Sequence, residues 1–231
     1  TLLLTVEIVK GDAARLKSIL EQDFPLAHDD NGPSLCLDSP GGSLDEGVAI
    51  AELLGAHFTS TVLEPGASCL SACAVAFMGG TFGWFEYRYN MRVMHPTARL
   101  GFHAPALSVG AGNYDAPTVV RAFDVAIDAV ARIAGDLDVV HLGGQVNRFP
   151  RSLLAQMLRH RGDDYLWIDT VEKAGAWDIT LNGAAGLDLT PERLVVACKS
   201  AERWLEDKPI MTFPQRDRDW LFEGRYDHVT Q

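Results

Sequence analysis

Short runs of apolar and β-branched residues alternate with runs of helical apolar spacing over the first 80 residues. The runs that predict strands are residues 4–12, 33–39 and 58–65. The runs that predict helices are residues 11–24, 40–57 and 71–80, the last of them short and buried. Because strands and helices follow one another in turn, the pattern favours an α/β fold with a mostly parallel sheet and right-handed crossovers.

The pattern loosens after residue 80 and later becomes helical again. Residues 81–98 are rich in aromatic side chains and predict a hairpin or an excursion, and residues 99–105 predict a strand that ends at a proline turn. Further helices are predicted at 115–138, 152–162 and 190–207. Residues 163–179 predict a strand, a short helix and a closing strand. We expect one domain over residues 1–190, followed by a C-terminal helix and tail over residues 191–231.

The amino-acid composition and the net charge limit the functions that this chain can have. The chain has 231 residues, of which 47% are hydrophobic and 22% are charged, and this suits one globular domain with a sizeable core. Its formal net charge of -11 argues against nucleic acid as a partner, because phosphates repel an acidic surface. No apolar run in the sequence is long enough to predict a transmembrane segment. The four cysteines form no C-x-x-C pair, so we expect no structural zinc.

Two glycine- and serine-containing segments carry candidate chemistry. The segment "DSPGGSL" follows a predicted strand and opens a helix, so Gly41 and Gly42 could bring unpaired backbone N–H groups close to a ligand oxygen. The plainer interpretation is a tight strand-to-helix turn. The segment "GASCLSACAVAFMGG" has Ser71 at the mouth of an apolar helix, where it serves either as a small packing residue or as a nucleophile.

A nucleophilic serine needs a base, and the base needs a carboxylate to orient it. His103 ends an apolar strand just before a proline turn, which is a frequent place for catalytic side chains, although a lone histidine there is more often structural. Asp163 and Asp164 precede another apolar strand, and by themselves they are typical of a solvated turn. Each of these signals is weak when it is taken alone.

As an ordered set, "LDSPGGSLDEGVAIAELL", "GASCLSACAVAFMGG" and "ARLGFHAP" resemble the Clp-type serine peptidases of the ClpP/crotonase superfamily. Within it, the chain is most similar to ClpP-like proteins of bacterial envelopes, and the resemblance covers residues 4–190. The resemblance implies repeated β-β-α and β-α units around a mostly parallel sheet. It also implies a peptidase that acts on peptides or unfolded proteins, needs no cofactor and assembles as a homo-oligomer.

The family's functional residues can be carried over one position at a time. The resemblance makes Ser71 the nucleophile and His103 the general base, and it gives the oxyanion hole to the backbone N–H groups of Gly42 and Ala72. It makes Asp163 the carboxylate that orients the base, and Asp164, one step away, is the alternative.

The chain departs from the family's pattern in three regions. It is longer between the nucleophile and the base, where residues 82–93 form an aromatic run, and longer again between the base and the aspartate. Residues 200–231 have no counterpart in the family, so the resemblance does not decide whether this chain assembles into rings. We expect the aromatic run to form an interface or to cover the cleft, with a hairpin folded back on its own core as the alternative. Its large side chains are Trp84, Phe85, Tyr87 and Tyr89.

The resemblance to envelope proteins implies an exported, periplasmic location. The chain starts abruptly at its first predicted strand, so we expect that a preceding signal segment has been removed. In an oxidising compartment we expect a disulfide from Cys198 to either Cys69 or Cys73, whose spacing of four residues would let them lie on one helix face.

Four other interpretations remain open from the sequence. Ser68 is a rival nucleophile, although it lacks the second glycine of a G-x-S-x-G elbow. A Ser–Lys dyad would need one of the five lysines, which are Lys10, Lys17, Lys173, Lys199 and Lys208. Crotonase-type acyl-CoA chemistry would use the same oxyanion hole without a serine triad. The non-enzymatic alternative is a catalytically inactive ClpP-like scaffold or binding protein.

Overall fold

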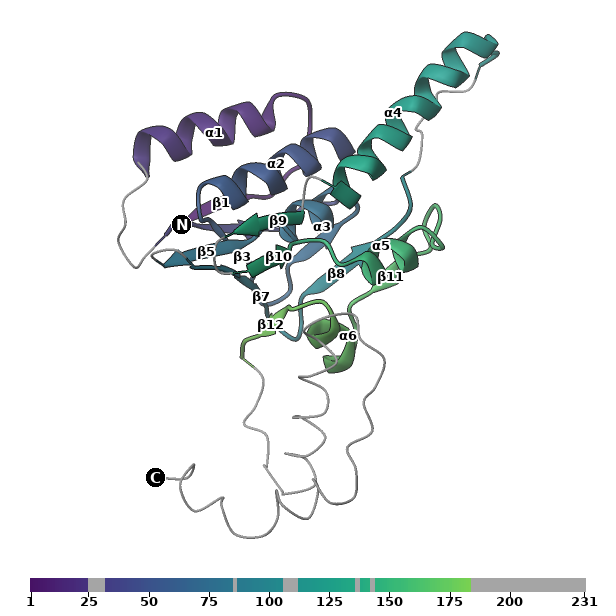
Figure 1. Cartoon of the computed structure of the whole chain (residues 1–231). Coiled ribbons are helices and arrows are strands. Elements are labelled where there is room, and N and C mark those ends of the chain that lie inside the picture. The colour runs from purple at the N-terminus through teal and green to yellow at the C-terminus, as the bar shows by residue number, and fades with distance from the viewer. Residues whose placement is uncertain (25–31, 85–86, 106–111, 136–137, 142–143, 184–231) are drawn as a thin grey trace, which may run out of the picture.

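The computed structural model describes the chain except for residues 25–31, 85–86, 106–111, 136–137, 142–143 and 184–231 (Figure 1). Five parallel strands form its central sheet, in the order β1-β2-β3-β7-β12. These strands are β1 (Leu2–Leu4), β2 (Ser34–Leu37), β3 (Ser60–Leu63), β7 (Arg92–Met94) and β12 (Thr180–Leu181). The expectation of an α/β fold with a mostly parallel sheet is therefore confirmed.

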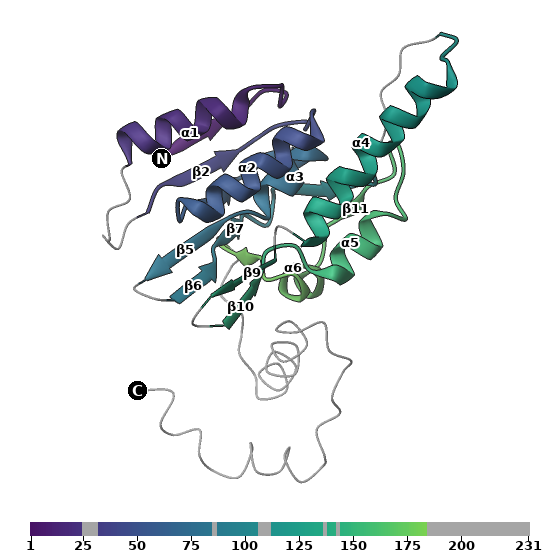
Figure 2. The same cartoon turned by 45° about the horizontal axis from the view of Figure 1, so that its top comes forward.

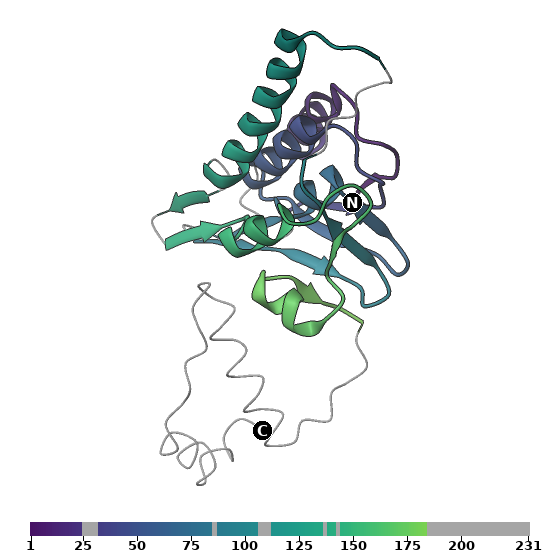
Figure 3. The same cartoon turned by 90° about the vertical axis from the view of Figure 1, so that its right-hand side faces the viewer.

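Two helices, α1 (Asp12–Asp23) and α2 (Leu44–Ala56), lie together over one face of this sheet (Figures 1 and 3). The hydroxyl of Ser43 caps α2 by accepting a hydrogen bond from the backbone N–H of Glu46. The Glu46 carboxylate then accepts N–H bonds from Gly11 and Ala13, each at 3.0 Å, at the start of α1. One side chain therefore fixes the two helix N-termini relative to each other.

A second, three-stranded sheet stands beside the first in the order β11-β8-β4. It contains β4 (Ser68–Leu70), β8 (Arg99–Phe102) and β11 (Leu166–Trp167), with β4 parallel and β11 antiparallel to β8. Ser39, just beyond β2, joins the two sheets, because its N–H donates to the Ser68 carbonyl and its carbonyl accepts from the Leu70 N–H. The chain segments that enter the candidate site meet at this junction.

The helix α3 (Ala72–Phe77) is buried along its whole length and packs against α2. The sequence prediction of a short buried helix from residue 71 is confirmed, although the helix ends earlier than predicted, at Phe77. Ser68 and Cys69 belong to β4 and not to the helix, because the chain reverses direction at Ser71. The apolar run contains a strand, a turn and a helix.

The aromatic segment after residue 80 contributes to two structures. β5 (Thr81–Trp84) and β6 (Tyr87–Asn90) form the expected antiparallel hairpin, and Tyr89 is exposed. The side chains of residues 84–88 lie outside the described part, so the roles predicted for Trp84, Phe85 and Tyr87 stay predictions. The next strand, β7, leaves the hairpin and enters the central sheet, which the sequence pattern did not predict.

β7 places a buried, charged side chain in the central sheet. Arg92 is fully buried, and its Nη1 donates to the Trp177 carbonyl at 3.0 Å. Its Nε and Nη2 atoms have no hydrogen-bond partner among the described residues. Burial lowers the pKa of Arg92 to about 10, while the charge of Asp178 opposes this and that of Arg148 adds to it.

The second half of the chain adds three helices and a hairpin. The helices are α4 (Ala116–Gly135), α5 (Arg151–Met157) and α6 (Val171–Ala176), close to their predicted positions. The hairpin, β9 (Asp138–His141) with β10 (Gly144–Asn147), was not predicted. The N-terminal half of α4 projects away from the body, and its C-terminal half packs beside α2 and α5 (Figure 2). No helix in the described ranges has the length and apolar character required to cross a membrane. The predicted C-terminal helix lies outside those ranges.

Candidate active site

Ser71 occupies a sharp turn between β4 and α3. Its backbone has φ 57° and ψ -122°, a conformation that is rare and unfavourable for a residue with a side chain. The surrounding backbone holds this conformation: the Ser71 N–H donates to the Gly101 carbonyl at 3.0 Å, and the Ser71 carbonyl accepts from Val75 at 3.2 Å. Such a strained strand-to-helix turn is a geometry that presents a nucleophilic hydroxyl away from the backbone.

The predicted glycine turn lies directly against this serine. A Cβ on Gly41 would come within 2.8 Å of the Ser71 Cβ and 2.5 Å of the Leu70 carbonyl oxygen. Both Gly41 and Gly42 also have positive φ angles, of 99° and 135°. The turn therefore needs glycine both for its backbone conformation and for its approach to the serine.

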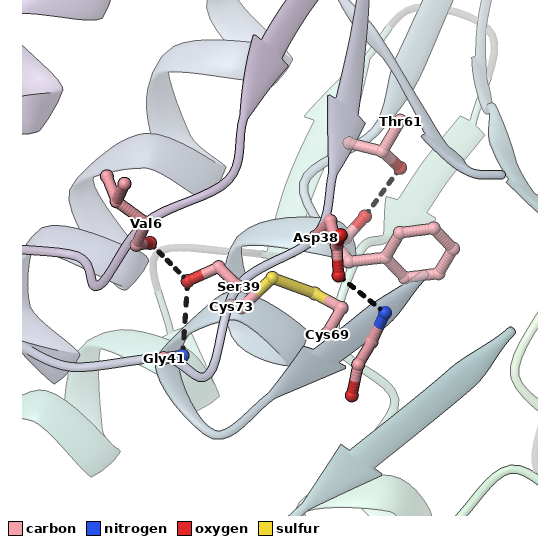
Figure 4. Close-up of a disulfide and its surroundings, with 9 residues drawn as sticks. Val6, Asp38, Ser39, Gly41, Thr61, Cys69 and Cys73 are labelled. Carbon is pink, nitrogen blue, oxygen red and sulfur yellow. Dashed lines mark hydrogen bonds between the residues drawn. A yellow bond between two sulfur atoms is a disulfide. The ribbon is translucent and has the colours of Figure 1, made fainter. Parts of the chain in front are cut away.

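Ser39 fixes the beginning of the same turn (Figure 4). Its buried hydroxyl donates to the Val6 carbonyl at 2.6 Å and accepts from the Gly41 N–H at 3.2 Å. A neighbouring carboxylate, that of Asp38, accepts from the Ser68 N–H at 2.9 Å and so ties the turn to β4. These bonds hold the glycine turn and the serine turn in a fixed relation.

The two predicted oxyanion donors have no hydrogen-bond acceptor within the described part of the chain. The backbone N–H groups of Gly42 and Ala72 donate no hydrogen bond to any residue that the structure describes. Ala72 is the first residue of α3, where N–H groups have no partner within the helix. Two such N–H groups beside one serine hydroxyl are what stabilisation of a tetrahedral oxyanion requires.

Ser71, His103 and Gly42 line one cavity of about 240 Å³. The structure therefore brings together the predicted nucleophile, base and one oxyanion donor. The sequence reasoning missed the remaining walls, which come from α2, α4 and α5 and include Asp45, Val125, Ala126, Ala129 and Met157. The apolar spacing of the α4 residues was visible in the sequence, but nothing there indicated which face of the helix would meet the serine.

His103 follows β8 and lies at the cavity with its imidazole half-buried. Its Nδ1 atom is buried and has no hydrogen-bond partner, and no hydrogen bond joins its ring to the Ser71 hydroxyl among the described residues. The ring instead packs against the side chain of Tyr165, with ring centroids 5.0 Å apart and planes at 78°.

The structure does not bring the predicted aspartate to His103. Asp163 is exposed, and within the described ranges its carboxylate accepts no hydrogen bond. Asp164 instead contacts His160, with Oδ2 3.1 Å from Nδ1. Both acids precede β11, which pairs with β8, so they lie near the base without orienting it in this conformation.

A disulfide joins Cys69 to Cys73 across the serine turn (Figure 4). The expectation that one of these cysteines would bond to Cys198 is therefore wrong, and Cys198 itself lies outside the described residues. The two cysteines do not lie on successive turns of one helix, because Cys69 is in β4 and Cys73 is in α3. The chain reversal at Ser71 brings their Cα atoms to 5.2 Å from each other. Both are fully buried.

The rival assignments find less support in the geometry. Ser68 does not line the cavity, and its N–H is bonded to Asp38. The lysines at 10, 17 and 173 do not line it either; Lys173 donates instead to Asp169 and to the Trp167 carbonyl. Lys199 and Lys208 lie outside the described ranges. Over those ranges, no group of three or more His, Cys, Asp and Glu side chains is arranged to hold a metal ion.

Comparisons with known proteins leave the family unassigned. Neither a protein-family model nor a curated protein matches this chain. The resemblance to Clp-type peptidases therefore remains a prediction from the sequence, and the function has to be argued from the geometry of the cavity around Ser71.

Proposed function

We propose that the protein is a serine peptidase in which Ser71 is the nucleophile and His103 is the general base. The observation that carries the proposal is the strained turn at Ser71, which is packed against the Gly41–Gly42 turn and shares a cavity with His103. A conformation that costs on the order of 1–3 kcal/mol persists where the surrounding structure enforces it, and such residues cluster at active sites. The ClpP-type arrangement of repeated units is part of the same proposal.

The proposed reaction is acyl transfer through a covalent intermediate. The Ser71 Oγ attacks the carbonyl carbon of a peptide while His103 takes the hydroxyl proton, and His103 then returns that proton to the leaving amine. A water activated by His103 releases the acyl group from Ser71. The N–H groups of Gly42 and Ala72 donate to the oxyanion, and each such donor contributes about 3 kcal/mol in well-studied acyl-transfer enzymes.

The proposed substrate is a peptide or an unfolded segment of protein, as the resemblance implies. The cavity supports this because apolar side chains from α4 and α5 line it beside the serine, and these could bury a side chain of a substrate. Homo-oligomeric assembly and export belong to the same proposal. The Cys69–Cys73 disulfide is compatible with an oxidising compartment.

Labelling with a fluorophosphonate probe tests the proposal directly. We expect the wild-type protein to be labelled at Ser71, the Ser71→Ala variant to be unlabelled and unable to cleave a fluorogenic peptide, and both to have the same circular dichroism spectrum. Ser68→Ala is the matched control and should be labelled at the wild-type rate, because Ser68 does not line the cavity. An unlabelled wild-type protein, or an equally labelled Ser71→Ala variant, would refute the proposal.

One observation favours a second candidate, a catalytically inactive scaffold that retains the fold. Among the residues that the structure describes, no carboxylate contacts the buried Nδ1 of His103, whereas a Ser-His-Asp triad uses such a bond to fix the tautomer of the base. The scaffold predicts that the probe does not label Ser71 even at high concentration, although a peptide still protects the cavity from hydrogen exchange. The same labelling experiment therefore separates the two candidates.

A further inference from the structure

The base of the proposed site belongs to a continuous row of packed side chains on two paired strands. Trp167 lies opposite Gly101 in the antiparallel pair of β11 with β8, and the same register places Tyr165 opposite His103. The rings of Tyr165 and Trp167 have centroids 5.1 Å apart, and the Arg99 guanidinium carbon lies 4.6 Å from the centre of the Trp167 ring. The row therefore runs from Arg99 through two aromatic rings to His103.

A glycine makes room for this row. Gly101 lies between Arg99 and His103 on the same face of β8, because side chains alternate along a strand. A Cβ at this position would approach the Trp167 ring to 2.9 Å and the Tyr165 ring to 3.1 Å. Any side chain on Gly101 would thus displace the two rings that support the imidazole.

We propose that Tyr165 is a positioning residue that orients the His103 imidazole toward Ser71. The inference rests on the proposed role of His103 as the base. His103 Nδ1 is buried without a hydrogen-bond partner in the described part of the chain, so no hydrogen bond there fixes the orientation of the ring. The contact with Tyr165, at 5.0 Å and 78°, is an edge-to-face geometry that aromatic rings prefer. Trp167 packs against Tyr165 in turn, and Arg99 packs against Trp167.

Two substitutions at Tyr165 distinguish positioning from general stability. Tyr165→Phe keeps the ring and should leave kcat within a factor of about two, whereas Tyr165→Leu removes it and should lower kcat about tenfold with KM nearly unchanged, since the base no longer starts aligned with the serine. Rates are normalised to active sites titrated with the fluorophosphonate probe, so a loss of folded protein does not count. A merely structural role predicts an unchanged kcat per active site in both variants.

Gly101→Ala is a second variant, in case Tyr165→Leu fails to fold. It keeps both rings but forces them apart, and we expect a smaller decrease in kcat, again with KM nearly unchanged. If Tyr165→Leu and Gly101→Ala both retain wild-type kcat per active site, the proposal is overturned.

A spectroscopic measurement tests positioning without relying on activity. In histidine-labelled protein, ring currents from Tyr165 should shift the His103 ring-proton resonances away from random-coil values, and Tyr165→Phe should preserve that shift. Tyr165→Leu should abolish it and broaden the signals, because the imidazole samples several rotamers. Unchanged His103 resonances in Tyr165→Leu would overturn the positioning role. A positive result in a protein that never labels at Ser71 would show that only the proposed peptidase function has failed.

Discussion

At the scale of single residues, the site depends on how tightly the two turns fit together. Ser71 holds a positive φ angle although it is not glycine, and the backbone bond to Gly101 together with the contact with Gly41 leaves it little freedom to relax. Conformational strain of this kind is maintained by the rest of the fold, so substitutions beside the serine affect function and stability together.

Substituting each of the two acids before β11 tests whether either one orients His103 during the reaction. Neither Asp163 nor Asp164 bonds to His103 in this structure, so we expect Asp163→Asn to lower kcat less than about tenfold, far below the roughly ten-thousandfold loss known for a triad aspartate. Asp164→Asn serves as the matched variant, and peptide cleavage provides the measurement. A thousandfold loss in Asp163→Asn alone would instead mean that this carboxylate reaches His103 when substrate is bound.

At the scale of elements, the disulfide connects the strand before the nucleophile to the helix after it. We expect the double variant Cys69→Ala, Cys73→Ala to lower the free energy of unfolding by about 2 kcal/mol, because a short closed loop still removes some entropy from the unfolded chain. Urea unfolding followed by tryptophan fluorescence measures this. Cys36→Ala is the control, since Cys36 is a free thiol and is only half-buried. Equal stability of the double variant and the control would contradict the prediction.

For the buried arginine of β7 we predict a substitution that raises the stability of the protein, whereas removal of the disulfide lowers it. Arg92→Met keeps much of the volume of the side chain and removes a charge whose Nε and Nη2 lack partners among the described residues, so we expect the free energy of unfolding to rise by about 1 kcal/mol. In the control, Arg132→Met, a partly exposed side chain loses ion pairs to Glu52 and Asp45, and stability should fall by less than about 1 kcal/mol. If Arg92→Met unfolds at much lower denaturant concentration, the bond from Nη1 to the Trp177 carbonyl outweighs the cost of burying the charge, and the prediction is wrong.

The elements that the sequence predicted are those with a strong local pattern. The helices α1, α2 and α4 have clear apolar spacing, and the glycine turn and the apolar helix after Ser71 have distinctive compositions. β7 was missed because its three residues include a buried arginine, which is rare in the middle of a sheet. β4 was missed because its three residues merge into the small, apolar residues of α3.

Only the residues closest to the proposed reaction could be predicted from the sequence, and the residues packed around them could not. Ser71, His103 and the Gly41–Gly42 turn were candidates because each lies at the end of a strand or the start of a helix, and their roles came from the resemblance to Clp-type peptidases. The contacts of Tyr165 with His103 and the wall contributed by α4 depend on pairing between segments that are far apart in the chain. No local pattern reports such pairing.

At the scale of the whole molecule, α4 exposes an apolar stripe where it projects from the body. Val120, Phe123 and Ile127 lie on one side of the helix and are all at least half exposed, while Ala126 and Ala129 face the cavity. A projecting apolar stripe is unfavourable in water, which supports the proposed homo-oligomer.

We expect the triple variant Val120→Ser, Phe123→Ser, Ile127→Ser to shift the protein toward monomer, as measured by light scattering coupled to size-exclusion chromatography. Val171→Ser removes a comparably exposed apolar side chain from α6 and should leave the mass unchanged. A wild-type protein that is already monomeric at high concentration, or a triple variant of unchanged mass, would count against assembly through α4.

The disulfide between Cys69 and Cys73 also provides a way to measure the local opening of the serine turn. Both sulfur atoms are fully buried, so a dissolved reductant reaches them only in moments when the turn opens. The rate of reduction at low dithiothreitol concentration therefore reports how often the segment around Ser71 opens, without any label or substitution. A ligand that fills the cavity should slow this chemistry in proportion to its occupancy, which gives a binding assay even for a compound that is never cleaved.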